Sequence, residues 1–333
     1  MKAFIIDSYG GADHVRAGET PVPEVGESEV LVQIHAAGIN PLDSKIRNGE
    51  FKQILPYGLP LVLGNEAAGI VVRVGSGVQR FKPGDEVYTR PRKTRIGTFA
   101  EYIAIAEDDV ALKPKALTME EAASIPLVGL TAWQALIERA NLKKGQKVLI
   151  HAGSGGVGTF AIQLAKHVGA TVATTASAAN FDLVKRLGAD IAIDYRKDDF
   201  EKILYGYDVV LNSLGGETLE KSLRVLKPGG KLISISGPPD SDFAKDIGAS
   251  LILSVAMRLL SYRIRRKAGR RQVRYSFLFS IASGDQLREI SPLLDAGIIR
   301  PVVDRVFPFE STKDAMAYVE TGRAKGKVVV KVR

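Results

Sequence analysis

Six residues in the middle of the chain have the types and spacing that suit a pyrophosphate group. The apolar run KVLIHA leads into G-S-G-G-V-G at 153–158, and TFAIQLAKHVG then continues with helical periodicity. In a G-x-G-x-x-G pattern the first glycine permits a tight turn, the second lets the backbone approach phosphates, and the third allows close helix packing. The N-terminus of the following helix offers unpaired N–H groups and partial positive charge. A glycine-rich loop without a ligand is the alternative, but the strand before and the helix after argue for dinucleotide binding by Gly153, Ser154, Gly155, Gly156 and Val157.

The end of the next apolar run indicates which dinucleotide is bound. A site for NAD usually has Asp or Glu there, about twenty residues beyond the glycines, to bind the ribose hydroxyls. This chain has T-T-A-S-A-A-N at 174–180, and the nearest acid, Asp182, is expected inside the following helix. A carboxylate would repel a 2′-phosphate, whereas hydroxyl and amide groups can donate hydrogen bonds to it. We therefore predict NADPH, bound by Ser177, Asn180 and Tyr195.

The composition excludes several other kinds of chemistry. The chain has no cysteine, so disulfides, thiolate nucleophiles and cysteine-ligated metals are excluded. Its four histidines are widely spaced, and no metal site is predicted. No window approaches the roughly 20 apolar residues of a spanning helix. The N-terminal MKAFIIDSYGG is typical of a strand entering a turn rather than a signal peptide, so we predict a cytoplasmic location.

The elements that must position the glycine-rich turn are of two kinds. Residues 1 to about 120 contain short strand-like runs separated by Gly, Pro and Asn. After Thr118, a candidate helix cap with Glu121 three residues later, strands and helices alternate, which predicts a parallel sheet covered by helices on both faces. The last sixty residues contain strands again and are expected to return to the first domain. The predicted α/β architecture is a β-rich domain of residues 1–122 and 275–333 and a doubly wound domain of residues 123–274.

The segment 251–274 carries most of the net charge. The formal charge is +9, and eight basic residues with no acidic one lie between Arg258 and Arg274, which leaves 9 − 8 = +1 elsewhere. Apolar positions at helical spacing predict a helix that buries one stripe and exposes a basic end; the stripe is 251, 252, 255, 256, 259 and 260. A weak peripheral contact with an anionic membrane through 251–274 is the alternative. Nucleic acid is not predicted, because no helix-turn-helix or aromatic platform accompanies the charge.

Five motifs along the chain resemble those of a known superfamily. They are A-A-G-I-N-P-x-D at 36–43, G-N-E-A-A-G-I-V at 64–71, K-P-G-D-E-V at 82–87, L-T-A-W at 130–133 and H-A-G-S-G-G-V-G at 151–158. Together they resemble the medium-chain dehydrogenase/reductase superfamily, in its quinone oxidoreductase and alkenal/enone reductase branch. The resemblance implies a GroES-like catalytic domain, a Rossmann cofactor domain with a basic helical insertion at about 244–274, and an active site between the domains.

The resemblance also indicates which reaction is expected. Zinc-dependent relatives have Cys and His ligands near the A-G-I and G-x-E segments, whereas this chain has no Cys and has Asn65 in place of the His. Zinc-type alcohol oxidation is not expected, because nothing would polarise the alkoxide. Hydride transfer from NADPH to a 2-alkenal, an enone or a quinone remains. A non-catalytic NADPH-binding redox sensor and a one-electron quinone reductase are the alternatives.

Two residues are predicted by resemblance to act in catalysis. Asn40 would hydrogen-bond the nicotinamide ribose or a substrate oxygen, unless it only caps or turns the chain before Pro41. Lys45 occupies a position where many quinone oxidoreductases have tyrosine and alkenal reductase-like relatives can have lysine. It could donate a hydrogen bond to the developing enolate oxygen, or it could simply face solvent.

The remaining cofactor contacts are also expected from the resemblance. Thr131 would lie near the nicotinamide, unless its hydroxyl only bonds its own helix backbone. Leu278 lies in a segment that lines the cleft in relatives, and Asn212 ends the strand-like run YDVVLN. Lys327, in the final R-A-K-G-K loop, could meet a cofactor phosphate or be a solvated loop lysine. Relatives commonly pair through the sheet edge of the cofactor domain, so a homodimer is predicted.

Overall fold

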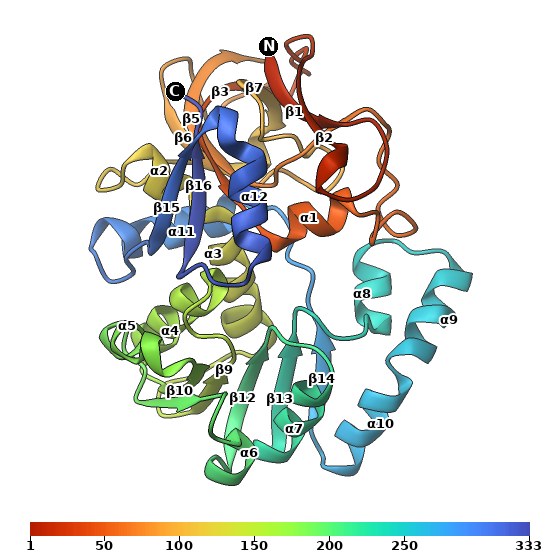
Figure 1. Ribbon diagram of the computed structural model, residues 1–333, viewed down its shortest axis with the longest axis vertical. Helices are drawn as coiled ribbons and strands as arrows, with labels where there is room; N and C mark the ends of the chain where they lie inside the picture. Colours follow the sequence, from red (N-terminus) through yellow and green to blue (C-terminus); the bar gives the residue numbers. More distant parts are fainter. The chain divides into compact units, whose positions relative to one another are not determined.

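The computed structural model describes residues 1–333, which divide into two compact units (Figure 1). Unit 1 contains Met1–Leu130 and Ile281–Arg333, and unit 2 contains Thr131–Ser280. The sequence placed the junctions at 122/123 and 274/275. In the structure the first junction lies between Leu130 and Thr131, within helix α3 (Pro126–Trp133). The second lies between Ser280 and Ile281, later than predicted, because β14 (Arg274–Phe277) is a strand of the unit 2 sheet.

Unit 1 is built on a seven-stranded sheet. Its strands run in the order β15-β16-β3-β5-β6-β8, and β7 pairs with β3 outside that path. A smaller sheet has the order β2-β1-β4. The strands are β1 (Lys2–Ile6), β2 (Val15–Glu19), β3 (Glu29–Ile39), β4 (Leu61–Val62), β5 (Ala67–Val74), β6 (Glu86–Thr89), β7 (Tyr102–Ala106), β8 (Val110–Leu112), β15 (Val303–Pro308) and β16 (Lys327–Lys331).

Alternating apolar positions on these strands form the core of unit 1. Ile34, Val71 and Val330 are completely buried in one cluster, as expected for strands with one face packed inward. Strand β16 pairs antiparallel with β3, with Val328 opposite Ile39, so the end of the chain meets its first forty residues. The helices of this unit are α1 (Pro41–Arg47), α2 (Met119–Ala123), α11 (Gly284–Asp295) and α12 (Thr312–Glu320).

Unit 2 is a parallel six-stranded sheet covered by helices. The strands have the order β11-β10-β9-β12-β13-β14, and every neighbouring pair is parallel. Chain order therefore reverses at β9, between β10 and β12, which is where doubly wound sheets bind dinucleotides. The strands are β9 (Lys147–Ile150), β10 (Thr171–Ala176), β11 (Ile191–Asp194), β12 (Tyr207–Asn212), β13 (Leu226–Ser234) and β14.

The helices of unit 2 pack on successive strands. Helix α4 contacts β9 and β10, α7 contacts β12 and β13, and α10 contacts β14 and α7. The helices are α4 (Gly156–Val168), α5 (Phe181–Arg186), α6 (Phe200–Ile203), α7 (Glu217–Val225), α8 (Ser241–Asp246), α9 (Leu251–Leu260) and α10 (Tyr262–Arg270). No helix in the structure is long and apolar enough to cross a membrane.

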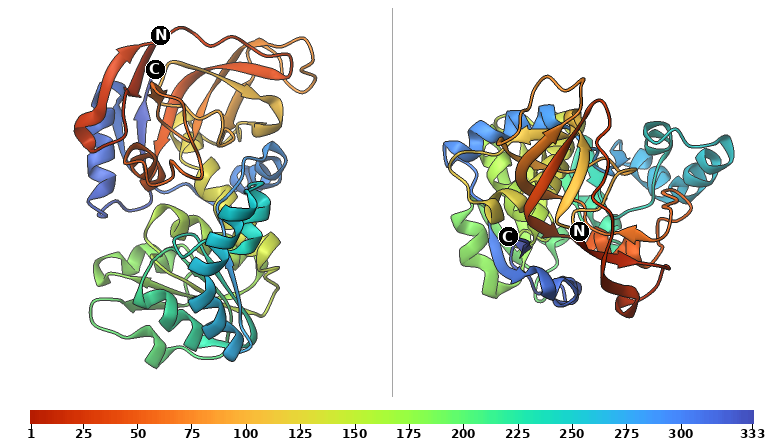
Figure 2. Two further views of the ribbon diagram at one scale, coloured as in Figure 1. Left: turned by 90° about the vertical axis from the view of Figure 1, so that its right-hand side faces the viewer. Right: turned by 90° about the horizontal axis from the view of Figure 1, so that it is seen from above.

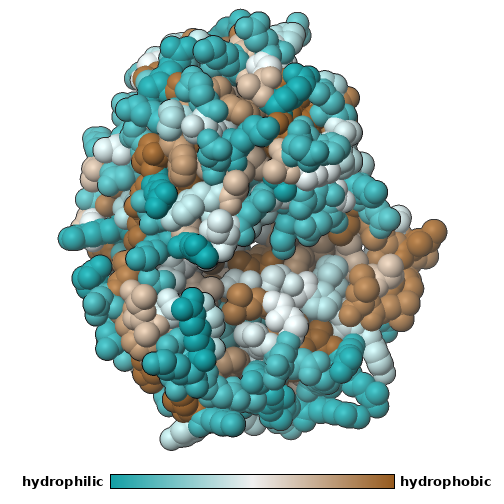
Figure 3. Space-filling model, in the orientation of Figure 1, coloured by the Kyte–Doolittle hydropathy of each residue, from teal (hydrophilic) through white to brown (hydrophobic).

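The segment 251–274 differs from its prediction. It forms two helices, and α9 projects away from the sheet of unit 2 (Figures 1 and 2). The stripe expected to be buried is open to solvent, since Leu251 is 81%, Ile252 84% and Leu259 69% exposed. Only Met257 of α9 is buried, because α10 packs on the sheet through Ile264 and Ala268 while α9 contacts chiefly α8 and α10. The prediction of a buried stripe is therefore wrong. Figure 3 shows the exposed side chains as an apolar patch where α9 lies in Figure 1.

Candidate cofactor and substrate sites

The turn between β9 and α4 has the geometry of a phosphate-binding loop. A Cβ atom on Gly153 would lie 2.0 Å from Thr174 Oγ1, and one on Gly158 would lie 2.3 Å from the carbonyl oxygen of Ala152. At Gly155 the nearest atom would be 3.3 Å away. The first and third glycines are thus required by packing within the chain, whereas the second leaves its backbone open to a ligand. No side chain caps α4 at Gly155, so the helix N-terminus is free for phosphate oxygens.

Residues at the end of β10 lie beside this turn. Asn180 Nδ2 donates a hydrogen bond to Ser154 Oγ at 3.0 Å, which joins two residues that the sequence assigned to the cofactor. Ser177 follows β10 directly and is half-buried. Its position and polarity fit the ribose end of a dinucleotide.

One cation near this place was missed in the sequence. Ala176 of β10 is in register with Asp194 of β11, so Tyr195 and Arg196 follow immediately beside the end of β10. Tyr195 is 58% exposed, and the guanidinium carbon of Arg196 lies 5.7 Å from the centre of its ring. Arg196 is exposed. Parallel pairing of β10 with β11 brings Arg196 to the same end of the sheet as Ser177, although the two residues are distant in the sequence.

Asn212 supports the loop after β12. Its side chain is fully buried, and Nδ2 donates to the carbonyl of Leu214 at 2.6 Å and to Ser234 Oγ at 3.3 Å. Its Oδ1 accepts from the amide of Leu214 at 3.2 Å. Asn212 lies at the carboxyl end of β12, next to the point where strand order reverses, and its hydrogen bonds position the loop that follows. Its contact with a cofactor stays a prediction.

Thr131 and Leu278 occupy neighbouring buried positions of unit 2. Thr131 Oγ1 donates to Ser280 Oγ at 3.0 Å, so its hydroxyl does more than bond its own helix backbone. Leu278 is 3% exposed, and its amide donates to the carbonyl of Ser234 at 2.8 Å. Their predicted contacts with the cofactor stay predictions.

A network of buried charged and amide groups lies in unit 1, where β3 ends and α1 begins. Asn40 Nδ2 donates to Glu66 Oε1 at 2.7 Å, and its Oδ1 accepts from Lys327 Nζ at 2.5 Å. Lys327 Nζ also donates to Glu66 Oε1 at 2.6 Å and to the carbonyl of Ile39 at 3.0 Å. The other oxygen of Glu66 accepts from the amide of Leu127 at 2.7 Å. All three residues are at most 4% exposed, so the network is fixed and shielded from water.

The position of Lys327 corrects a prediction. Lys327 begins β16 instead of lying in a solvated loop, because β16 pairs with β3 and carries the residue to Asn40. Its ammonium has three donors, and all three are used by Ile39, Asn40 and Glu66. The alternative of a solvated loop lysine is therefore wrong. Contact between Lys327 and a cofactor phosphate stays a prediction, and within the chain the residue orients Asn40.

Asp43 and Asn65 extend this network. Asp43 is completely buried. Its carboxyl group accepts hydrogen bonds from the backbone N–H of Asn40 at 2.7 Å and from Asn65 Nδ2 at 2.6 Å. Burial raises the pKa of Asp43 to about 7, although the hydrogen bonds from Asn65 and Asn40 act in the opposite direction. Asn65 thus serves as a hydrogen-bond donor to Asp43.

Lys45 lies on α1 with its ammonium free. Its neighbours Ser44 and Arg47 both bond Glu320 of α12, at 2.6 and 2.8 Å, which fixes the helix. Lys45 is half-buried, and its side chain makes no hydrogen bond or ion pair with the chain. It is therefore available to a ligand, and its predicted catalytic role is untested by this geometry.

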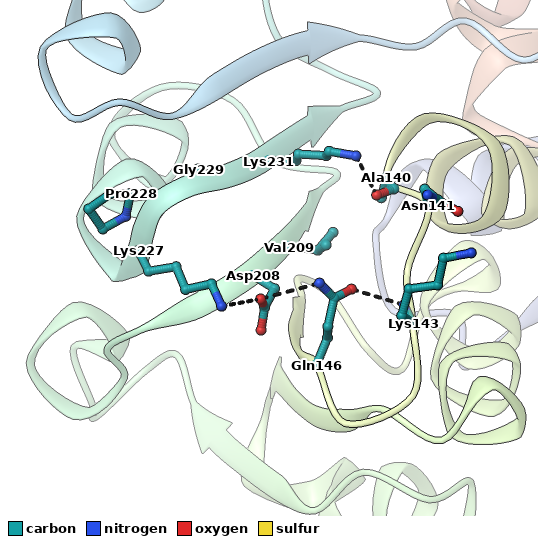
Figure 4. Close-up of a pocket in the computed structure, with 10 residues that line it drawn as sticks. All are labelled: Ala140, Asn141, Lys143, Gln146, Asp208, Val209, Lys227, Pro228, Gly229 and Lys231. Atoms are coloured by element: carbon teal, nitrogen blue, oxygen red, sulfur yellow. Dashed lines mark hydrogen bonds and ion pairs between the residues drawn. The ribbon is translucent and has the colours of Figure 1, made fainter.

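A polar hollow at the opposite edge of the unit 2 sheet is distinct from these sites. Asp208 in this hollow is paired with Lys227 at 2.6 Å and accepts from Gln146 Nε2 at 3.3 Å (Figure 4). Asp208 lies near the start of β12, whereas the glycine-rich turn follows the end of β9. Within the hollow Asp208 is paired with Lys227, and Lys231 donates to the carbonyl of Ala140 at 2.7 Å.

Models of two protein families match the chain. Residues 26–115 match the alcohol dehydrogenase GroES-like domain, and residues 187–330 match the zinc-binding dehydrogenase family. The NADPH-dependent alkenal/one oxidoreductase of Arabidopsis thaliana chloroplasts is 39% identical over 345 residues, which cover 99% of this chain and 79% of the relative.

Solved structures agree over the whole chain. The quinone oxidoreductase from Coxiella burnetii has a TM-score of 0.88 and 33% identity, with 100% of this chain and 99% of that chain covered. The Escherichia coli quinone oxidoreductase complexed with NADPH has a TM-score of 0.83 and 28% identity, with 100% of both chains covered.

Proposed function

The chain belongs to the medium-chain dehydrogenase/reductase superfamily, in its zinc-free branch of quinone and alkenal/enone reductases, and we propose that it reduces an electron-poor acceptor with NADPH. The acceptor is an α,β-unsaturated carbonyl compound or a quinone. The observation that carries this proposal is the glycine-rich turn at the reversal point of the parallel sheet, followed by a β10 end that has no carboxylate.

The residues of unit 2 fit NADPH. The open backbone at Gly155 and the uncapped start of α4 would hold the pyrophosphate. Ser177, Asn180, Tyr195 and the nearby Arg196 would hold the 2′-phosphate, since hydroxyl, amide and guanidinium groups donate to phosphate oxygens. When bound, NADPH supplies the hydride.

The residues of unit 1 supply orientation and a hydrogen-bond donor. Asn40 is held in one amide orientation by Glu66 and Lys327, and the oxygen of its amide retains one lone pair for a hydroxyl group of a ligand. Lys45, whose ammonium is free, would donate to the carbonyl oxygen of the acceptor as negative charge develops there. The buried network excludes water from the groups that hold Asn40.

Turnover with a small panel of acceptors tests the proposed function. NADPH and NADH are each followed by absorbance with a 2-alkenal, a cyclic enone and a quinone. We expect oxidation of NADPH, in preference to NADH, with at least one acceptor. Tight NADPH binding without oxidation by any acceptor would contradict the reductase proposal and favour the non-catalytic sensor.

We also propose a homodimer and a cytoplasmic location. Strand β14 is one edge of the unit 2 sheet and pairs within the chain only with β13, so a second copy could pair along this edge where its backbone is not already bonded, as the amide of Phe277 is to Asp240 Oδ2 at 2.9 Å. The location remains the prediction made from the sequence.

We further propose that helices α9 and α10 contact an anionic membrane surface. Leu251, Ile252 and Leu259 present exposed apolar side chains on α9, and most basic side chains of the following segment are exposed: Arg258, Arg263, Arg265, Arg266, Arg270, Arg271 and Arg274. A hollow between α7 and α10 is lined by four cations, Arg224, Lys267, Arg270 and Arg271, and by a single acid, Glu220, already paired with Lys267. Exposed apolar groups on α9 together with a basic hollow at α10 suit lipid chains and headgroups.

A further inference from the structure

Arg90 is a buried cation without a partner. It follows β6 in unit 1 and is 3% exposed. Its guanidinium makes no hydrogen bond or ion pair with any residue, and its Nε is shielded from solvent. The nearby Arg92 behaves differently, since its side chain is 47% exposed and bonds Asp109 at 2.7 and 3.1 Å.

A guanidinium in this position is costly to keep. It carries five N–H donors and, in a folded chain, remains protonated at neutral pH. Burial lowers the pKa of Arg90 to about 10, and the negative charge of Glu66 is the largest influence in the opposite direction. The carboxylate of Glu66, however, already accepts from Asn40, Lys327 and Leu127. The negative charge of Glu66 therefore offsets part of the positive charge of Arg90, but the chain offers no hydrogen-bond acceptor to the N–H groups of Arg90.

Strand pairing places Arg90 beside the groups assigned to the reaction. Thr89 of β6 is in register with Ala67 of β5, and the two strands are antiparallel, so Arg90 lies opposite Glu66. Tyr57 is a further neighbour, since the charge of Arg90 opposes the burial that raises the pKa of its hydroxyl. Arg90 thus lies beside the buried network that orients Asn40.

We propose that Arg90 binds the oxygen of the hydride acceptor, holding the carbonyl group of an α,β-unsaturated substrate through its guanidinium N–H groups. This rests on the function proposed above. Hydride from NADPH forms a C–H bond at the β-carbon, and the electron pair of the C=C bond moves to make an enolate. Arg90 stabilises the negative oxygen and keeps its own protons, while a proton from water completes the product at the α-carbon and NADP⁺ is released.

Replacement of Arg90 tests this assignment. We expect Arg90→Met to lower kcat for a cyclic enone by roughly 100-fold, with KM for NADPH unchanged, because a donor to the developing oxyanion is lost. Arg90→Lys should retain part of the rate. The melting temperature of Arg90→Met should be equal to or above that of the wild type, because an unpaired buried charge is replaced by an apolar chain of similar length. Arg92→Met is the matched control and should leave kcat within about twofold of the wild type.

Two results of this experiment would overturn the proposal. One is a kcat of Arg90→Met within about threefold of the Arg92→Met value, which would show that Arg90 does not act on the reacting oxygen. The other is a parallel fall of kcat and melting temperature, which would show a structural role.

A binding measurement separates this proposal from the function on which it rests. Crotonate, a small unsaturated carboxylate, serves as an unreactive mimic of the enolate and is titrated calorimetrically into the NADPH complex. We expect the wild type to bind it at least about 10-fold more tightly than Arg90→Met. Equal affinity, or no binding by the wild type, would contradict the role of Arg90. If the wild type bound crotonate through Arg90 but turned over none of the acceptors, the result would count against the proposed reaction alone.

Discussion

The amide of Asn40 is oriented by two buried charges of opposite sign. Lys327 donates to its oxygen and Glu66 accepts from its nitrogen. A flipped amide would place its NH₂ group against the ammonium of Lys327 and its oxygen against the carboxylate of Glu66, so one orientation is fixed. The amide and carboxyl groups therefore form a fixed frame for whatever binds at the start of α1. Lys327 is a positioning residue of this frame.

At the same scale, the cofactor preference depends on a few side chains at the ends of β10 and β11. We expect Ser177→Glu to weaken NADPH binding by roughly 100-fold while changing NADH little, because a carboxylate would oppose the 2′-phosphate. Arg196→Gln should weaken NADPH by about 10-fold and leave NADH unchanged. Dissociation constants from NADPH and NADH fluorescence measure both effects.

The exposed neighbour Lys197 supplies the control for these variants. Lys197→Gln removes an equal charge one residue further along the chain and should leave both dissociation constants within about twofold. If Ser177→Glu or Arg196→Gln weakened NADPH and NADH equally, these residues would not contact the 2′-phosphate.

Local pattern identified some of the site residues and could not identify others. The glycines at 153–158 and the absence of a carboxylate near Ser177 are visible in a short stretch of sequence. The contact of Lys327 with Asn40 spans 287 residues and depends on the pairing of β16 with β3. Arg90 and Arg196 were missed for the same reason, since each reaches its place through the register of neighbouring strands.

At the scale of elements, α9 shows why periodicity does not determine burial. Its apolar spacing predicts a stripe that faces something, but the structure leaves the stripe exposed because α10 occupies the space beside β14. The sequence therefore identified the helix and its apolar face, but it did not identify the surface against which that face packs. An exposed apolar face next to a basic segment suits an anionic membrane.

Flotation with lipid vesicles tests this surface. We expect the wild type to float with vesicles that contain phosphatidylglycerol and not with vesicles of phosphatidylcholine alone. The triple variant Leu251→Ser, Ile252→Ser, Leu259→Ser should lose at least about 10-fold in binding, since burial of apolar side chains supplies much of the affinity. The control double variant Ile203→Ser, Tyr205→Ser alters exposed apolar residues elsewhere on unit 2 and should float as the wild type does.

Sedimentation of the same proteins gives the oligomeric state. A dimer is expected for the wild type and for the α9 variant alike, because the proposed dimer contact is β14. A monomeric α9 variant would show that this face joins two copies of the chain, and a wild type that fails to float would also contradict the membrane proposal.

For the whole molecule, the order of elements along the chain was largely predictable. Strands interrupted by turns indicated unit 1, and alternating strands and helices indicated the parallel sheet of unit 2. The junctions were less predictable, because α3 runs through the first and β14 completes a sheet whose other strands lie earlier in the sequence. The two units contribute separate parts of the proposed reaction, with cofactor binding in unit 2 and orientation of the acceptor in unit 1.

Transfer of an isotopic label tests the central claim, which is hydride transfer from NADPH to carbon, most directly. The protein is supplied with each of the two NADPH stereoisomers deuterated at the nicotinamide C4 and with a cyclic enone, and the product is analysed by mass spectrometry and NMR. We predict one deuterium at the β-carbon from one stereoisomer and none from the other. Oxidation of NADPH that leaves no deuterium on the β-carbon from either stereoisomer would contradict the account and favour one-electron reduction.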